Sequence, residues 1–179
     1  MRKHARSLIA LIQREIGKPR WVCEVGCWRG HTTMALLRKL TSTKILAVDP
    51  WDAGGDFSTE YVEPERIASI KEEFFKNVEP WHERLLLIQL PSIKAVETVR
   101  DRSLGVVFID ACHTYEHVRE DVLAWLPKVR PGGLLCGHDY NGTGDRTGKF
   151  GVKRAVDELA SLYNKTTCTE SGHIWWWKI

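Results

Sequence analysis

The chain has 179 residues, of which 43% are hydrophobic and 27% charged, so it is long enough to bury the core of one domain. These proportions exclude an intrinsically disordered, collagen-like or low-complexity protein. The 26 Lys and Arg against 23 Asp and Glu leave a net charge of +3, which is too weakly basic to indicate nucleic acid as a partner.

The first residues resemble neither a secretory signal nor a membrane anchor. The apolar run at residues 8–12 is broken by Gln13, Arg14 and Glu15, whereas a signal peptide needs a longer apolar region. No stretch approaches the roughly 18 apolar residues of a membrane span. The five cysteines have no regular spacing and are typical of reduced thiols. We therefore expect a cytoplasmic protein with no membrane partner.

Helix-like and strand-like segments alternate along the chain, and this alternation predicts an α/β fold with a parallel sheet. An amphipathic helix over residues 3–16 is expected to end at Gly17. The strands that we expect next are residues 21–25, 44–49, 85–89, 104–110 and 134–138. We expect helices over residues 32–40, 115–126 and 152–162. Two further helices are expected, one that begins at Pro64 and one that is capped by Ser92. Residues 131–133 (Pro-Gly-Gly) are predicted to form a turn.

The C-terminal tail predicts two further strands, residues 165–170 and 174–179, which the short link between them makes antiparallel. Trp175 and Trp177 would share one face of the last strand and Trp176 the other. They pack against the flanking helices, or, if that face is exposed, they provide the contact of a homodimer.

Two glycines follow the first strand, in the run Glu24-Val25-Gly26-Cys27-Trp28-Arg29-Gly30. Such glycines let the chain turn tightly and let a ligand lie against bare backbone, although a plain strand–helix turn explains them too. A dinucleotide loop would carry a third glycine. Asp49 ends the second strand about 20 residues later, where an acidic side chain meets ribose hydroxyls in nucleotide-binding folds. A helix cap or a loop carboxylate is the alternative for Asp49.

Three runs together, VCEVGCWRGHTT, ILAVDP and VVFIDACHTYEHVREDVLAWLPKVRPGGLLCGHDY, resemble the class I S-adenosylmethionine-dependent methyltransferases. They are most similar to the small-molecule O-methyltransferases of the catechol and macrocin types, and the resemblance covers roughly residues 20–140. It implies a single class I methyltransferase domain over residues 1–179. The fold would be a Rossmann-like, doubly wound seven-stranded sheet, mostly parallel, with an antiparallel C-terminal strand.

The resemblance also implies which residues bind S-adenosylmethionine. Glu24, Gly26 and Gly30 would line its methionine part and Asp49 its ribose. Trp51 would stack on the adenine or shield it, and Ser92 would lie near the adenine or simply cap its helix. The full set expected to contact the cofactor is Glu24, Gly26, Cys27, Trp28, Gly30, Asp49, Trp51, Ser92 and Asp110.

The acceptor end of the site is expected where the fourth and fifth strands finish. His113 lies where the related enzymes carry their general base, with Asp110 beside it, although a histidine at a helix N-terminus can also have no catalytic role. His117 would be structural and share a helix face with His113.

Asp110, His138 and Asp139 occupy the position of a divalent metal in the related families. The catechol type has Asp-Asn where this chain has His138-Asp139, which weakens the case for Mg²⁺ and leaves room for Mn²⁺, iron or zinc. A metal-free site, with His138 as a second base or a substrate contact, remains open.

The predicted activity is S-adenosylmethionine-dependent O-methylation of a small polar acceptor such as a sugar, polyol or phenol, with His113 as the base. Residues 51–63 and 141–149 are the expected lid and acceptor walls. An NAD(P)-dependent oxidoreductase and a non-catalytic binding domain are the two alternatives.

Overall fold

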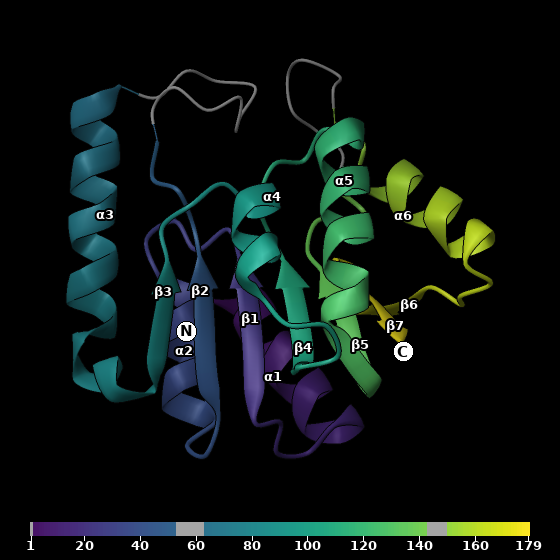
Figure 1. Cartoon of the computed structure of the whole chain (residues 1–179), viewed down its shortest axis with the longest axis horizontal. Helices are drawn as coiled ribbons and strands as arrows, with labels where there is room; N and C mark the ends of the chain where they lie inside the picture. Colours follow the sequence, from purple (N-terminus) through teal and green to yellow (C-terminus); the bar gives the residue numbers. More distant parts are fainter. Residues whose placement is uncertain (1, 53–62, 143–149) are drawn as a thin grey trace.

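The structure is a computed structural model, and it describes residues 2–52, 63–142 and 150–179. Its centre is a seven-stranded sheet in the order β3-β2-β1-β4-β5-β7-β6 (Figure 1). The strands are β1 (Trp21–Val25), β2 (Lys44–Val48), β3 (Leu85–Ile88), β4 (Leu104–Ile109), β5 (Val129–Gly137), β6 (Cys168–Glu170) and β7 (Ile174–Lys178). β3, β2, β1, β4 and β5 pair in parallel, and β7 pairs antiparallel with both β5 and β6. The predicted sheet, including its antiparallel C-terminal strand, is confirmed.

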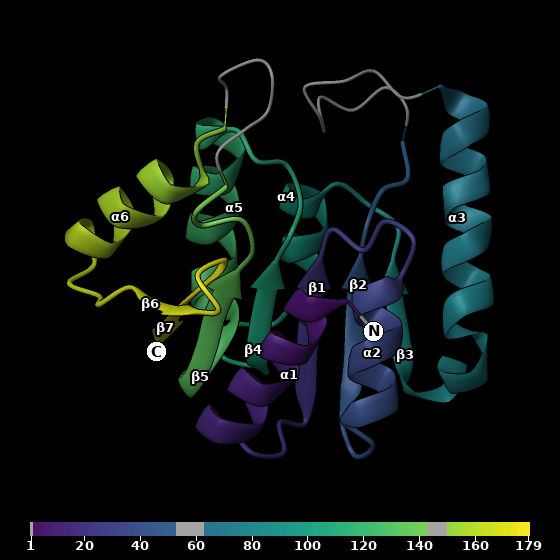
Figure 2. The ribbon, with the colours of Figure 1, turned by 180° about the vertical axis from the view of Figure 1, so that it is seen from behind.

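Helices cover both faces of the sheet. They are α1 (Lys3–Glu15), α2 (His31–Lys39), α3 (Pro64–Val78), α4 (Ser92–Ala95), α5 (Tyr115–Trp125) and α6 (Val152–Leu162). One buried cluster packs α1, α2 and α3 on one face, and a second packs α4, α5 and α6 on the other. Figure 2 shows α1 and α2 in front of the sheet when the molecule is seen from behind. The carboxyl ends of the parallel strands therefore meet at one edge, where ligands bind in such folds.

The Pro-Gly-Gly run at residues 131–133 lies inside β5, so the prediction of a turn there is wrong. Pairing between β4 and β5 is irregular opposite Leu104 and Val106, and Gly132 has a φ of 73°. A side chain at Gly133 would lie 2.7 Å from the Gly105 carbonyl oxygen, so only glycine permits this approach. The run makes a bulge in a continuing strand.

The C-terminal tryptophans are part of the core. Trp175 and Trp177, on one face of β7, are buried within the second cluster, and Trp176, on the other face, is partly buried against the first cluster. The packing interpretation is confirmed, so the tryptophans give no support to a dimer contact. In the described part of the chain, no helix is long and apolar enough to cross a membrane.

Candidate functional site

The loop after β1 bends sharply against the neighbouring strand end. Gly26 has a φ of 87°, and a Cβ at this position would lie 2.3 Å from the backbone oxygen of Asp110. Gly30 has a φ of 74°, and a Cβ at this position would lie 2.7 Å from the ring of Phe74. Both positions need glycine, because a side chain would be strained and would collide. The loop therefore adjoins the end of β4 directly.

Asp49 holds this loop in place. Its Oδ2 accepts hydrogen bonds from the backbone amides of Cys27 and Trp28, each at 2.8 Å, and its Oδ1 accepts one from the amide of Trp51 at 2.9 Å. Burial raises the pKa of this carboxyl, and the three amide bonds oppose that rise. A carboxylate offers about four acceptor positions, so roughly one remains for a ligand. This is fewer than the two that bidentate binding of a ribose requires.

Glu24 is fully enclosed below the loop. Its side chain is 1% exposed and accepts a 2.5 Å hydrogen bond from the Thr33 hydroxyl. Burial raises the pKa of this carboxyl well above its usual range. In this structure Glu24 braces β1 against α2, and its carboxyl does not open onto the surface.

Trp51 and Ser92, both predicted near an adenine, are engaged by the protein. Trp51 packs on Phe74 at 4.7 Å between ring centroids, and its indole N–H donates to the Trp28 carbonyl at 2.9 Å. The Ser92 hydroxyl donates to Asp121 and accepts a 2.8 Å hydrogen bond from the Trp125 indole. The residue that caps α4 is Pro91, so the helix-cap interpretation of Ser92 is wrong.

Four titratable side chains gather where β4 and β5 end. Asp139 is central, because its Oδ2 lies 3.0 Å from both His113 Nε2 and His138 Nδ1. Asp110 Oδ1 lies 3.7 Å from His138 Nδ1 and 4.0 Å from His113 Nε2. The sequence placed all four at this edge, and the structure brings them into one cluster. We call Asp110, His113, His138 and Asp139 the acid–histidine cluster.

The cluster shifts the proton affinity of its members. Burial raises the pKa of Asp110 to about 6, although His138 works against this. Burial also lowers the pKa of both imidazoles, but the Asp139 carboxylate outweighs it and leaves the pKa of His113 and of His138 raised. The same two imidazoles hold the pKa of Asp139 well below its usual range. Asp139 therefore stays ionised, and its negative charge stabilises the protonated form of either neighbouring histidine.

His113 lies in the loop before α5, not on the helix. Thr114 is the residue that precedes α5, and His117 in its first turn lies 2.7 Å from the Thr114 hydroxyl through Nδ1. The prediction that His113 and His117 share a helix face is therefore wrong. His113 stacks on Phe150 at 5.2 Å, and its carbonyl accepts a hydrogen bond from Gly151, so the entry to α6 fixes its position.

Three side chains of the cluster have donor atoms close enough together to hold a metal ion, and this set includes His113 in place of the expected His138. One ligand atom each from Asp110, His113 and Asp139 lies within 4.8 Å of the others. His113 Nε2 is buried and makes no hydrogen bond of acceptable geometry, although Asp139 Oδ2 lies 3.0 Å from it. Nitrogen and oxygen donors together favour Mn²⁺, iron or zinc over Mg²⁺, which prefers oxygen alone.

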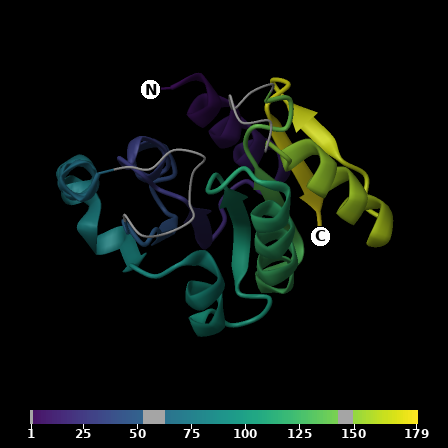
Figure 3. The ribbon, with the colours of Figure 1, turned by 90° about the horizontal axis from the view of Figure 1, so that it is seen from above.

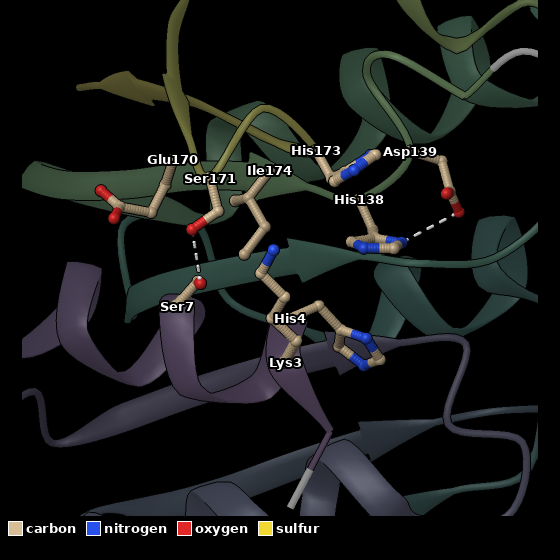
Figure 4. A pocket seen from close by; sticks show the side chains of 9 residues that line it. All are labelled: Lys3, His4, Ser7, His138, Asp139, Glu170, Ser171, His173 and Ile174. Atoms are coloured by element: carbon tan, nitrogen blue, oxygen red, sulfur yellow. Dashed lines mark hydrogen bonds and ion pairs between the residues drawn. The ribbon is translucent and has the colours of Figure 1, made fainter.

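Sequence patterns missed the contribution of the two chain ends. His4, from α1, contacts His138 at 4.7 Å between ring centroids, and His173, from the β6–β7 turn, lies 6.2 Å from it (Figure 4). Burial and the neighbouring His138 lower the pKa of His4 to about 4. No local pattern signals these contacts, because each joins segments that are far apart in the chain.

The sequence profile of a methyltransferase domain family matches residues 23–140, which span β1 to the end of β5. An uncharacterized protein of Sinorhizobium fredii (strain NBRC 101917 / NGR234), y4gI, is 26% identical over 153 residues. This match covers 81% of the chain, and the chain spans only 15% of that relative's length.

Solved structures of similar fold cover nearly the whole chain. The O-methyltransferase from Bacillus cereus in complex with SAH aligns with a TM-score of 0.68 at 18% identity, over 100% of this chain and 82% of the other. TomG from Streptomyces achromogenes, an O-methyltransferase involved in tomaymycin synthesis and solved with SAM, aligns with a TM-score of 0.70 at 14% identity, over 99% and 81%. At these identities the likeness establishes the fold.

Proposed function

The chain belongs to the methyltransferase domain family, and on that premise we propose that it transfers a methyl group from S-adenosylmethionine to a hydroxyl oxygen of a small polar acceptor. The observation that carries this proposal is the contact of Gly26 with the backbone of Asp110. It joins the expected cofactor loop to the acid–histidine cluster, so that a donor and an acceptor bound there would be neighbours. The similar structures described as O-methyltransferases support oxygen as the methylated atom.

We propose that the loop after β1 binds S-adenosylmethionine. Gly26 leaves bare backbone at the end of β1, and Trp28 at the rim of the loop is 41% exposed. Asp49 is proposed to accept a ribose hydroxyl at its remaining position, while its amide bonds keep the loop closed. We propose that Cys27, Gly30 and Trp51 shape this loop from within. Glu24 lies beneath this loop and supports it. The contact between Ser92 and the adenine of the cofactor stays a prediction.

His113 is the residue that we propose as the general base. S-adenosylmethionine supplies an electrophilic methyl group on a positively charged sulfur, which leaves as a neutral thioether and needs no proton. The task left to the protein is to align the acceptor and to take its hydroxyl proton. His113 would receive that proton, and the Asp139 carboxylate 3.0 Å away would stabilise the resulting imidazolium. Asp110 would hold the acceptor hydroxyl in line.

We propose that a divalent metal binds in the same cluster, held by Asp110, Asp139 and the expected ligand His138, whereas the donor atoms that lie within 4.8 Å of one another are those of Asp110, His113 and Asp139. When bound, it would lower the pKa of an acceptor hydroxyl and orient it. We propose Mn²⁺ over Mg²⁺, because His138 contributes nitrogen. Calorimetric titration of EDTA-treated protein with MnCl₂ and with MgCl₂ tests this directly. Saturable Mn²⁺ binding that is abolished in His138→Ala is expected, and equal or absent binding of both ions contradicts it.

The test of the proposed reaction follows tritium from methyl-labelled S-adenosylmethionine into phenols, polyols and sugars. We expect His113→Ala to lower the rate of transfer by about 10²–10⁴ while leaving the affinity for S-adenosylhomocysteine unchanged. His117→Ala is the matched control, because this histidine lies in the first turn of α5, outside the cluster. Unchanged turnover in His113→Ala would remove the base assignment.

We also propose that the protein works in the cytoplasm, since its five cysteines are free and thiols persist in a reducing compartment. Family membership argues against the NAD(P)-dependent alternative, and so does the absence of a third glycine from the loop. A non-catalytic domain would show no turnover with any acceptor.

A further inference from the structure

A pocket of about 240 Å³ opens beside the acid–histidine cluster, between α1 and the β6–β7 turn (Figure 4). His138 and Asp139 form one wall of it. His138 also lines the small space that contains Asp110 and His113, so the pocket and the expected reaction centre share a wall. Figure 3 shows that α1 lies beside the β6–β7 hairpin, although the two are at opposite ends of the chain.

The two sides of the pocket are tied together. The Ser7 hydroxyl, on α1, lies 2.7 Å from the Ser171 hydroxyl in the turn. Arg14, further along α1, donates a 3.0 Å hydrogen bond to Glu170. Ile174 provides an apolar floor. Two hydrogen bonds therefore join the α1 side of the pocket to the β6–β7 side.

One charged group of the pocket lining has no partner of opposite charge in the described part of the chain. Asp139 Oδ2 lies 3.0 Å from His113 Nε2 and His138 Nδ1, and Glu170 pairs with Arg14, which also pairs with Glu15. Lys3 also lines the pocket, Figure 4 shows its ammonium group directed into it, and within the described residues no carboxylate pairs with it. The first turn of α1 contains no acidic residue and has no side-chain cap, so its amides add partial positive charge at the same end. The unpaired ionic group of the described lining is therefore a cation.

We propose that this pocket binds the anionic group, a carboxylate or a phosphate, of a small hydroxylated methyl acceptor, and that Lys3 is the residue that selects it. The volume of the pocket falls below the roughly 300–1,000 Å³ of sites for drug-sized ligands, which limits the acceptor to a small metabolite. With the anion at Lys3, the acceptor extends past His138 and brings its hydroxyl to the cluster. This inference rests on the proposed function, because it assigns the acceptor of that reaction.

Matched pairs of probes test the inference without knowledge of the natural acceptor. The pairs are 3,4-dihydroxybenzoate against catechol, and glucuronate or glucose 6-phosphate against glucose. Calorimetric titration in the presence of S-adenosylhomocysteine measures each dissociation constant. We expect at least one of the anionic probes to bind more tightly than its neutral partner. Comparison of the carboxylate probes with glucose 6-phosphate shows which anion is preferred.

Two variants locate the binding. Lys3→Gln is expected to weaken binding of the acid about three- to tenfold and to leave the neutral probe unaffected, whereas Lys3→Arg retains the preference. Lys18→Gln is the matched control, because Lys18 is exposed beyond the other end of α1. Ser7→Phe, which fills the pocket, is expected to abolish binding of the acid while S-adenosylhomocysteine still binds.

Equal binding of acids and neutral probes overturns the proposal, as does a wild-type protein that binds no acid. Undiminished binding of the acid by both Lys3→Gln and Ser7→Phe would place the anion elsewhere and overturn it too. Selective binding of the acid by a protein that does not bind S-adenosylhomocysteine would uphold the anion site and contradict the methyltransferase assignment. The two proposals therefore fail separately.

Discussion

At the scale of single residues, Asp49 holds the loop after β1 in place and is also the residue proposed to bind the ribose of the cofactor. Its carboxylate already accepts three amide hydrogen bonds, so it organises the loop that a cofactor would enter. The sequence predicted an acidic side chain at this place from its distance to Gly26. It could not reveal that most of the acceptor positions are taken, because those bonds come from backbone amides that carry no sequence signal.

Gly26→Ala tests the close approach of the loop to β4. We expect it to weaken binding of S-adenosylhomocysteine by more than tenfold, because the new Cβ would meet the Asp110 carbonyl at 2.3 Å and displace the loop. Gly17→Ala is the control, since Gly17 has a similar φ of 77° with open space around it. It is expected to cost about 1–2 kcal/mol of stability with no effect on binding. If Gly26→Ala and Gly17→Ala bind S-adenosylhomocysteine with similar affinity, the close packing of Gly26 against the backbone of Asp110 is contradicted.

Asp121→Asn tests a buried carboxyl beside Ser92. Burial raises the pKa of Asp121 to about 6 from 3.8, against the opposing hydrogen bond from Ser92. The folded protein therefore binds this proton more tightly than the unfolded chain does. The protonated carboxyl therefore contributes to the free energy of unfolding in full below pH 3.8. This contribution, up to about 3 kcal/mol, is lost as the pH rises through 6.

Urea unfolding of wild type and variant between pH 4 and 8 measures this effect. Asp121→Asn is expected to be more stable than wild type at pH 8 and to lose this advantage near pH 4. The exposed Glu72→Gln variant is expected to follow the wild-type curve. A pH-independent difference between Asp121→Asn and wild type would show that burial does not govern this carboxyl.

At the scale of elements, Arg84 joins the end of α2 to the start of β3. Its guanidinium donates to the carbonyl of Leu37, in the last turn of α2, and to the carbonyls of Leu40 and Thr43, which follow the helix. Arg84→Met is expected to lower the free energy of unfolding by about 2 kcal/mol. Arg38→Met, at an exposed position in the last turn of α2, is expected to change it by less than about 0.5 kcal/mol. Chemical denaturation compares the two, and equal effects would contradict the capping role.

Element boundaries were largely predictable from hydrophobic spacing, and the errors have physical causes. β1 agrees with its prediction, because apolar residues and a following glycine mark it clearly. β5 begins five residues earlier than expected, at Val129, because the glycine pair that predicts a turn forms a bulge within the strand. The position of His113 depends on contacts with Phe150 and Gly151, which a local pattern cannot show.

At the scale of the whole molecule, the sequence predicted the part of the site that lies at strand ends. Asp110, His138 and Asp139 follow parallel strands, and the topology of the sheet brings such positions together. The pocket walls from α1 and the β6–β7 turn could not be predicted, because they meet only when the two chain ends fold onto the same edge (Figure 3).

We infer that the Gly26 loop and Asp49 together hold S-adenosylmethionine beside the acid–histidine cluster. Calorimetric titration of wild type and of Asp49→Ala with S-adenosylhomocysteine measures this binding, with NADH as the control ligand. We expect one saturable site in the wild type, at least tenfold weaker binding in Asp49→Ala, and no binding of NADH. Wild-type protein that does not bind S-adenosylhomocysteine, or an Asp49→Ala variant that binds it equally well, would show that this loop does not hold the cofactor.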